Sequence, residues 1–193
     1  MSWDTERTRR LLLTAAVEEF AQRGLAGARV DRIAAAAGIN KERIYQYFGG
    51  KAALFDAVLL FELDRLAEAV PLKARSPAEL IEYTGAVFDH HQQRPHLARL
   101  LHWEGLEREQ ASGLDETSRA GRYRDKVAVI AQCLPASNED TIGAGDVLLT
   151  IIALVTSWQV LPQLNCMILG SDAADIRRRR DVLTTSVRKL VSH

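Results

Sequence analysis

Apolar residues recur at helical spacing along almost the whole chain. Gly24 ends the first of these patterns, which consists of Leu13, Ala16, Val17, Phe20 and Ala21. A repeat of three or four residues places the apolar side chains on one face of an α-helix. No stretch alternates apolar and polar residues between hairpin turns in the manner of paired β-strands. The sequence therefore predicts an all-α protein.

Start and stop signals divide the first half of the chain into further helices. Short helices are expected from Val30 to Ala37, ended by Gly38, and from about Lys41 to Tyr47, with Asn40 as the N-cap. A long helix then runs from Lys51 to about Val70. The sequence from Ser76 to Glu79 combines a capping box with proline at the first helical position and opens another helix, which Pro95 ends.

The second half continues in the same way and brings the expected total to about nine helices. One begins at Pro95, the segment from Gln110 to Thr117 is expected to be a loop, and the next helix is stopped by Pro135. Ser137 and Asp140 are expected to cap an apolar helix over residues 138–161. The last helix is expected from about Asp172 to Val191.

The composition is that of a globular protein with a core. The chain has 193 residues, of which 47% are hydrophobic and 26% are charged. Cys133 and Cys166 lack the spacing of a metal site and are expected to be buried, reduced thiols in a cytoplasmic protein. The segment from Val147 to Gly170 has no charge, but it holds several polar residues and Pro162. It is therefore predicted to be buried between helices or subunits, with no membrane span.

A net charge of zero hides an asymmetry along the chain. Residues 1–51 carry nine basic and six acidic side chains, whereas the remainder carries 16 basic and 19 acidic ones. A positive segment on a mildly acidic body is typical of proteins that bind a polyanion.

Three short helices within about the first 48 residues have the arrangement of a helix-turn-helix. Gly38 supplies the conformational freedom for the tight turn between the second and third helices. The third helix is about 10 Å long and exposes polar and aromatic groups, which suits a major groove about 12 Å wide. The exposed side chains of this helix are expected to be Lys41, Arg43, Gln46 and Tyr47.

These residues closely resemble the N-terminal DNA-binding domain of TetR-type transcriptional regulators. The resemblance covers about residues 7–60 in detail, and its specific elements are Ile33-Ala34, Gly38, Tyr45, Tyr47-Phe48 and Lys51. It implies a helix-turn-helix domain over residues 1–50, with the motif itself at about 29–48. Residues 51–193 would then form a larger helical domain for ligand binding and dimerisation.

The resemblance also implies roles for individual residues. Asn40, Lys41 and Arg43 would enter the groove, while Tyr45, Tyr47 and Lys51 would contact phosphates. Arg29 stands where many members have a threonine that caps the second helix, so Arg29 becomes a candidate DNA contact. Alternatives remain open: Tyr45 as a core residue, Lys51 as a solvated helix start, and residues 41–43 as an ordinary charged face.

The larger domain offers weaker indications. Aromatic residues of this kind are more often part of the core, but the candidates for effector binding are Tyr83, Phe88, Trp103 and Trp158. The last two helices are the candidates for a dimer interface, through Val147, Ile151, Ile176, Leu183 and Val187. No metal site, cofactor motif or catalytic set is found, so an enzyme is not expected.

The sequence thus predicts a cytoplasmic, ligand-responsive DNA-binding transcriptional regulator. The expected form is a homodimeric repressor that binds a pseudo-palindromic double-stranded DNA operator and is released by a small-molecule effector. The alternative is a helical small-molecule-binding or assembly protein whose helix-turn-helix no longer binds DNA.

Overall fold

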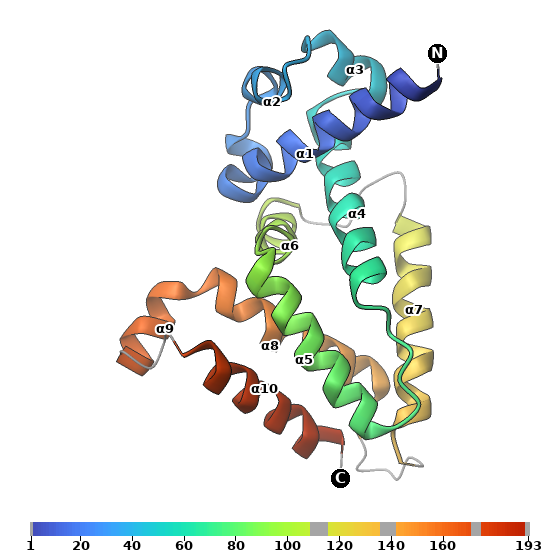
Figure 1. Cartoon of the computed structure of the whole chain (residues 1–193), viewed down its shortest axis with the longest axis vertical. Coiled ribbons are helices and arrows are strands. Elements are labelled where there is room, and N and C mark those ends of the chain that lie inside the picture. The colour runs from blue at the N-terminus through green and yellow to red at the C-terminus, as the bar shows by residue number, and fades with distance from the viewer. Residues whose placement is uncertain (1, 109–115, 136–141, 171–174, 192–193) are drawn as a thin grey trace. The chain divides into compact units, whose positions relative to one another are not determined.

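The protein is helical throughout the part that the structure describes. A computed structural model describes residues 2–108, 116–135, 142–170 and 175–191 (Figure 1). These residues form ten helices and no strand. The prediction of an all-α fold is therefore confirmed, with one helix more than the nine expected.

The first of two compact units carries the predicted helix-turn-helix. It contains α1 (Ser2–Gly27), α2 (Val30–Ala37), α3 (Glu42–Phe48), α4 (Lys51–Ala69) as far as Arg65, and α6 (His96–Glu107). Large side chains from several of these helices are fully buried, among them Phe20, Ile33, Ile44, Leu54 and Phe55. The rings of Phe20 and Phe55 pack edge to face, with centroids 5.2 Å apart.

Gly24 breaks α1 as predicted, although one more turn follows it. Its φ of 67° and ψ of −177° lie outside the helical region, so the helix kinks there before it ends at Gly27. Positive φ is a conformation that glycine adopts readily and other residues avoid. The kink therefore sets the direction in which the chain enters α2.

The second unit contains α5 (Pro77–Gln93), α7 (Glu116–Cys133), α8 (Ala144–Val160), α9 (Pro162–Leu169) and α10 (Ile176–Val191). Helix α5 packs against α8 and α10. The apolar faces of these three helices supply most of the core of the unit, through Leu80, Val87, Phe88, Val147, Ile151, Leu183 and Val187.

The capping box that opens α5 is present. Ser76 Oγ accepts a hydrogen bond from the Glu79 N–H at 3.2 Å, and Pro77 occupies the first helical position. Glu79 Oε2 accepts in turn from the N–H of Arg75 at 2.7 Å, one residue earlier than in the standard box. The start of this helix was therefore predicted correctly from local sequence.

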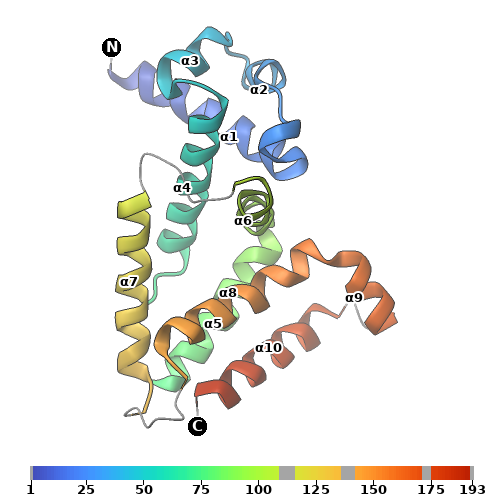
Figure 2. The ribbon, with the colours of Figure 1, turned by 180° about the vertical axis from the view of Figure 1, so that it is seen from behind.

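The largest difference from prediction lies at α8 and α9. Helix α8 begins at Ala144 rather than residue 138, and a separate helix, α9, follows Pro162. Both views of the chain show α9 turning away at the far end of α8 (Figures 1 and 2). No described helix could span a membrane alone, although α8 and α9, bent by 87°, together have the length and composition of a broken span.

Other sequence-based boundaries need smaller corrections. Helix α7 starts at Glu116, inside the predicted loop, while residues 110–115 of that loop and the predicted cap residues Ser137 and Asp140 lie outside the described residues. The compact units do not divide at residue 50, because most of α4 and all of α6 belong with the first unit. Cys133 is buried as predicted, but Cys166 is exposed.

Candidate nucleic-acid interface

The turn between α2 and α3 has the geometry that the sequence predicted. Gly38 adopts the left-handed conformation with φ 65°, and its N–H donates to the Ala35 carbonyl at 3.2 Å. The Ile39 N–H donates to the Ala34 carbonyl at 3.0 Å, which completes a Schellman motif. Burial of Ile33 and Ala34 anchors α2, and burial of Ile44 anchors α3. The opposite face of α3 is therefore held outward.

That outward face carries the residues predicted to meet DNA. Asn40, Lys41 and Arg43 are exposed, as is Tyr45, at 54% of its surface, while Tyr47 is half-buried. The exposure of Tyr45 excludes its alternative interpretation as a core tyrosine. Asn40 Oδ1 accepts from the Glu42 N–H at 3.4 Å, so Asn40 supports the first turn although the helix begins later than predicted.

Two of the cations on this surface have protein partners. Arg43 Nη1 donates to Gln46 Oε1 at 2.8 Å, one turn along the same helix. The Lys41 ammonium lies 3.2 Å from Asp31 Oδ1, and this hydrogen bond and attraction raise the pKa of Lys41 above its ordinary value. Both groups are exposed, so a phosphate or base edge can replace these partners at small cost.

Lys51 faces the protein rather than solvent. Its ammonium donates to the carbonyls of Ala26, in the last turn of α1, and Ala28, in the link to α2, at 3.3 and 3.2 Å. The lysine expected to contact phosphate therefore also connects the start of α4 to the end of α1 and the link that follows it. One of its three N–H groups remains for another acceptor.

The start of α2 is capped from α1, which the sequence did not reveal. Arg29 is exposed and extended, and its side chain makes no capping bond. Its N–H donates instead to Glu19 Oε1 at 2.9 Å, and Arg32 Nε donates to the same oxygen at 2.7 Å. Partial burial would raise the pKa of Glu19, but these two bonds hold that pKa below its ordinary value. The absence of a capping side chain at residue 29 was the signal for an acceptor elsewhere.

Helix α6 fastens the kink of α1 within the first unit. Glu107 Oε2 accepts from the N–H groups of Leu25 and Ala26 at 2.5 and 3.1 Å. Trp103 Nε1 donates to the Ala21 carbonyl at 3.2 Å. Trp103, predicted as a candidate effector-binding residue, is therefore a packing residue of the first unit, because its ring and its N–H are both used on α1.

The other three candidate aromatics belong to the second unit. Phe88 is fully buried, and burial raises the pKa of Tyr83 to about 12, with a smaller contribution from Tyr123. Trp158 is half-buried beneath the guanidinium of Arg179, 5.4 Å from the ring centroid. Their role in effector binding stays a prediction, and none of them lines the surface hollow on α10.

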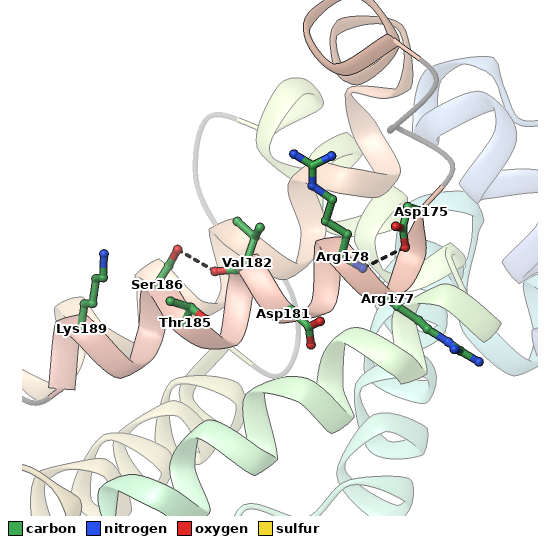
Figure 3. Close-up of a pocket in the computed structure, with 8 residues that line it drawn as sticks. All are labelled: Asp175, Arg177, Arg178, Asp181, Val182, Thr185, Ser186 and Lys189. Atoms are coloured by element: carbon green, nitrogen blue, oxygen red, sulfur yellow. Dashed lines mark hydrogen bonds between the residues drawn. The ribbon is translucent and has the colours of Figure 1, made fainter.

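That hollow lies along the exposed side of α10 and has a volume of about 650 Å³ (Figure 3). Arg178, Val182 and Lys189 project from the same side of the helix, and Thr185 and Ser186 lie between the last two. All the residues that line it come from α10 or the residue before it: Asp175, Arg177, Arg178, Asp181, Val182, Thr185, Ser186 and Lys189.

Four of the five residues predicted at a dimer interface are core residues of a single chain. Val147, Ile151, Leu183 and Val187 are each at most 5% exposed, whereas Ile176 is 48% exposed. Their helical stripe was identified correctly, but it faces the chain's own helices. If α8 and α10 contact a second copy, they must therefore use their opposite faces.

Comparison with known proteins covers both units. Residues 12–58 match the family described as bacterial regulatory proteins, tetR family, and residues 79–189 match the tetracyclin repressor-like C-terminal domain. The chain is 36% identical over 189 residues to the HTH-type transcriptional repressor SCO4008 of Streptomyces coelicolor, with 97% of each chain covered. It is 27% identical to the HTH-type transcriptional repressor NicS of Pseudomonas putida, with 93% of this chain and 88% of NicS covered.

Solved structures show the same fold over nearly the full length. SCO4942 of Streptomyces coelicolor superposes with a TM-score of 0.72 at 35% identity and covers 95% of this chain and 97% of its own. NalD, the secondary repressor of the MexAB-OprM multidrug efflux pump in Pseudomonas aeruginosa, superposes with a TM-score of 0.63 at 19% identity, with 97% and 98% covered.

Proposed function

Because this chain belongs to the TetR family of bacterial transcriptional regulators, we propose that it is a repressor that binds a pseudo-palindromic operator as a homodimer and is released by a small molecule. One observation carries the DNA-binding half of the proposal. Helix α3 buries Ile44 and turns Lys41, Arg43 and Tyr45 outward from a rigid turn. A rigid element that presents such groups is the usual means of reading a major groove.

The roles on DNA divide between bases and phosphates. Asn40, Lys41 and Arg43 stand at the start of α3, whose N-terminal residues reach base edges in helix-turn-helix proteins. Tyr45, Tyr47 and Arg29 present a hydroxyl or guanidinium for phosphate oxygens. Lys51, whose ammonium is largely engaged by main-chain carbonyls, would supply a secondary phosphate contact.

The exposed side of α10 supports the homodimer. Thr185 and Ser186 are small and let a second helix approach closely. An antiparallel copy of α10 that crosses at Thr185 places Asp181 opposite Lys189 of the second copy, and the two-fold axis repeats the pair. This arrangement uses the face that the hollow follows and leaves the buried stripe of α10 in the core.

The second unit is proposed to bind the effector. Its aromatic residues Phe88, which is buried, and Tyr83, which is half-buried, lie on α5, which packs on α8 and α10. A ligand held beside these helices would bias the arrangement of the two subunits, and hence the spacing of the two recognition helices. Half-sites in such operators are read about 34–36 Å apart.

Salt-dependent DNA binding tests the proposal directly. Fluorescence anisotropy with a labelled random duplex, between about 50 and 200 mM salt, should show a steep decline of affinity as salt increases. Selection from a randomised duplex library should then return a palindromic motif. The matched control is the double variant Lys41→Ala/Arg43→Ala, which should retain the fold and lose the motif. Weak, salt-independent binding and no selected motif would contradict a DNA-binding function.

A further inference from the structure

Helix α9 is an apolar helix that the described part of the chain leaves uncovered. Met167 is 76% exposed and Ile168 is 69% exposed, and Leu161 and Leu164 beside them are also exposed. No residue of α9 is buried. Large apolar side chains gathered on one short surface helix are the mark of an interaction site rather than of an ordinary surface.

Contacts with α8 and the proline at its start hold α9 in a defined position. Pro162 begins the helix, as proline favours, and Asn165 Nδ2 donates to the Trp158 carbonyl of α8 at 3.3 Å. The 87° bend directs α9 away from the line of α8, and both views show it at the end of α8 (Figures 1 and 2). The apolar residues are therefore presented at a defined angle.

The chemistry of the segment limits its partner. No residue from Val147 to Gly170 is charged. Nucleic acids and highly charged proteins are recognised through opposite charges, and α9 has no charged side chain with which to bind them. An apolar surface whose own residues are uncharged fits a partner with an equally apolar surface.

A second copy of the chain offers such an apolar surface. The proposed dimer of α8 and α10 also lacks an apolar core of sufficient size, which α9 would supply. A stable interface buries about 800 Å² on each partner and has an apolar core. The exposed face of α10 is mainly polar and charged, and its large apolar residues are Ile176 and Val182. On α8 the large exposed apolar residue is Leu149. These three side chains are too few for such a core, whereas Leu161, Leu164, Met167 and Ile168 would complete it.

We propose that α9 is a dimerisation arm, whose apolar side chains pack against a second copy of the chain and extend the interface beyond α8 and α10. The inference rests on the proposed homodimer. It adds a contact through α9 to an interface that would otherwise consist of α8 and α10 alone. In the isolated chain the arm is exposed, and in the dimer it is covered.

Sedimentation velocity with matched variants tests the arm. The variant Met167→Glu/Ile168→Glu should raise the dimer dissociation constant about tenfold or more, with an unchanged circular dichroism spectrum. Val182→Asp, on α10, tests the homodimer itself. Leu106→Glu is the control, because Leu106 is as exposed as Met167 but lies on α6 in the first unit.

The outcomes separate the two ideas. If Val182→Asp dissociates the dimer and the α9 variant does not, the arm is wrong and the homodimer stands. If the wild type is a monomer at all concentrations, the homodimer and the arm both fail. A wild-type monomer that binds lipid vesicles through α9 would overturn the arm in favour of a membrane surface.

Cys166 allows the same test without changing the apolar residues. It lies exposed on α9, while the other cysteine, Cys133, is buried. Labelling of Cys166 by a thiol reagent should slow about tenfold or more as the protein concentration passes the dimer dissociation constant, and Cys166→Ser gives the background. A labelling rate that is the same in monomer and dimer would show that α9 stays uncovered and would overturn the proposal.

Discussion

The indole ring of Trp103 lies so close over Gly24 that a β-carbon at residue 24 would stand 2.7 Å from the ring. The kink of α1 and the packing of α6 are therefore one feature, because α6 can approach only where α1 has no side chain. Glu107 reinforces the contact through the N–H groups of Leu25 and Ala26. The direction in which the chain enters the helix-turn-helix is thus set jointly by α1 and α6.

Replacing Gly24 should damage the first unit. Gly24→Ala adds a β-carbon that meets the rigid Trp103 ring and forces a non-glycine residue to φ 67°. We expect the free energy of unfolding to fall by about 2–4 kcal/mol, measured by urea denaturation at one protein concentration. Gly27→Ala is the control, because its β-carbon would make an ordinary contact 3.4 Å from the Arg23 β-carbon. Equal effects of the two changes would show that the ring does not fix the kink.

Lys51→Met should reveal a structural role that a phosphate contact would not have. The change retains the side-chain stem and removes the bonds to the Ala26 and Ala28 carbonyls. Stability should fall by about 1 kcal/mol, while the dependence of DNA affinity on salt changes little. Lys41 is exposed and is proposed to reach a base edge, so Lys41→Met should leave stability unchanged and should weaken binding to the selected operator by about 1–3 kcal/mol. A lower salt slope with unchanged stability in Lys51→Met would show that phosphate, and not the main-chain carbonyls, is the principal partner of Lys51.

Tyr45→Phe isolates one hydroxyl on the exposed face of α3. Tyr45 makes no contribution to the buried core, so the melting temperature should stay within about 1 °C of the wild type. Operator affinity should fall by about 0.5–1.5 kcal/mol, the usual value of a single hydrogen bond. Unchanged affinity for the selected operator, measured by anisotropy, would remove the Tyr45 hydroxyl from the interface.

A buried histidine should make the protein sensitive to mild acid. Burial of His91 on α5, with a smaller contribution from His90, lowers its pKa to about 4, and its Nδ1 has no hydrogen-bond partner among the residues that the structure describes. Between about pH 6.5 and 4 the unfolded chain therefore binds a proton that the folded chain does not. Stability from this group is intact above pH 6.5 and is lost progressively as pH falls to about 4, by up to ~3 kcal/mol.

The comparison of His91→Leu with the wild type isolates this effect from the acid titration of carboxylates. Melting temperatures at about pH 7.5 and pH 5 should differ less in His91→Leu than in the wild type. His102→Leu is the control, because it removes a histidine that is exposed. Identical pH dependence in all three proteins would show that His91 titrates normally.

Local signals in the sequence were sufficient for the helix-turn-helix. The Gly38 turn and the two short helices beside it depend on residues within a few positions of one another, so local sequence predicted them. The side chains that cap α2 and hold the end of α1 were not predictable in this way. Glu19 caps α2 from ten residues before Arg29, and Glu107 holds Leu25 from 82 residues away.

Periodicity failed in the second unit for two different physical reasons. A stripe such as Leu183 and Val187 indicates that a helix face is buried, but not whether the cover is the same chain or a second one. The apolar helix was expected to end before Pro162, although proline is also favourable at the first position of a new helix. The exposed helix α9, which follows that proline, was therefore missed.

The pairing of α5 with α10 gives a last prediction, on Gly85 and Arg180. A β-carbon at residue 85 would lie 2.6 Å from Nη2 of Arg180, whose Nε donates to both carboxylate oxygens of Asp89 at 3.0 and 2.9 Å. The guanidinium is the flexible end of its side chain, so Gly85→Ala should displace it and weaken the half-exposed pair with Asp89. That loss, about 0–1 kcal/mol, offsets the gain of about 1 kcal/mol from alanine in a helix.

In the wild type Gly85→Ala should therefore change the free energy of unfolding little, whereas in Arg180→Ala it should stabilise by about 1 kcal/mol. A double-mutant cycle at fixed protein concentration measures the difference. Gly105→Ala on α6 is the control, because its β-carbon meets nothing within 4 Å and should stabilise both backgrounds equally. If Gly85→Ala also stabilises both backgrounds equally, the guanidinium does not occupy the space above Gly85, and the closeness of α5 and α10 has another cause.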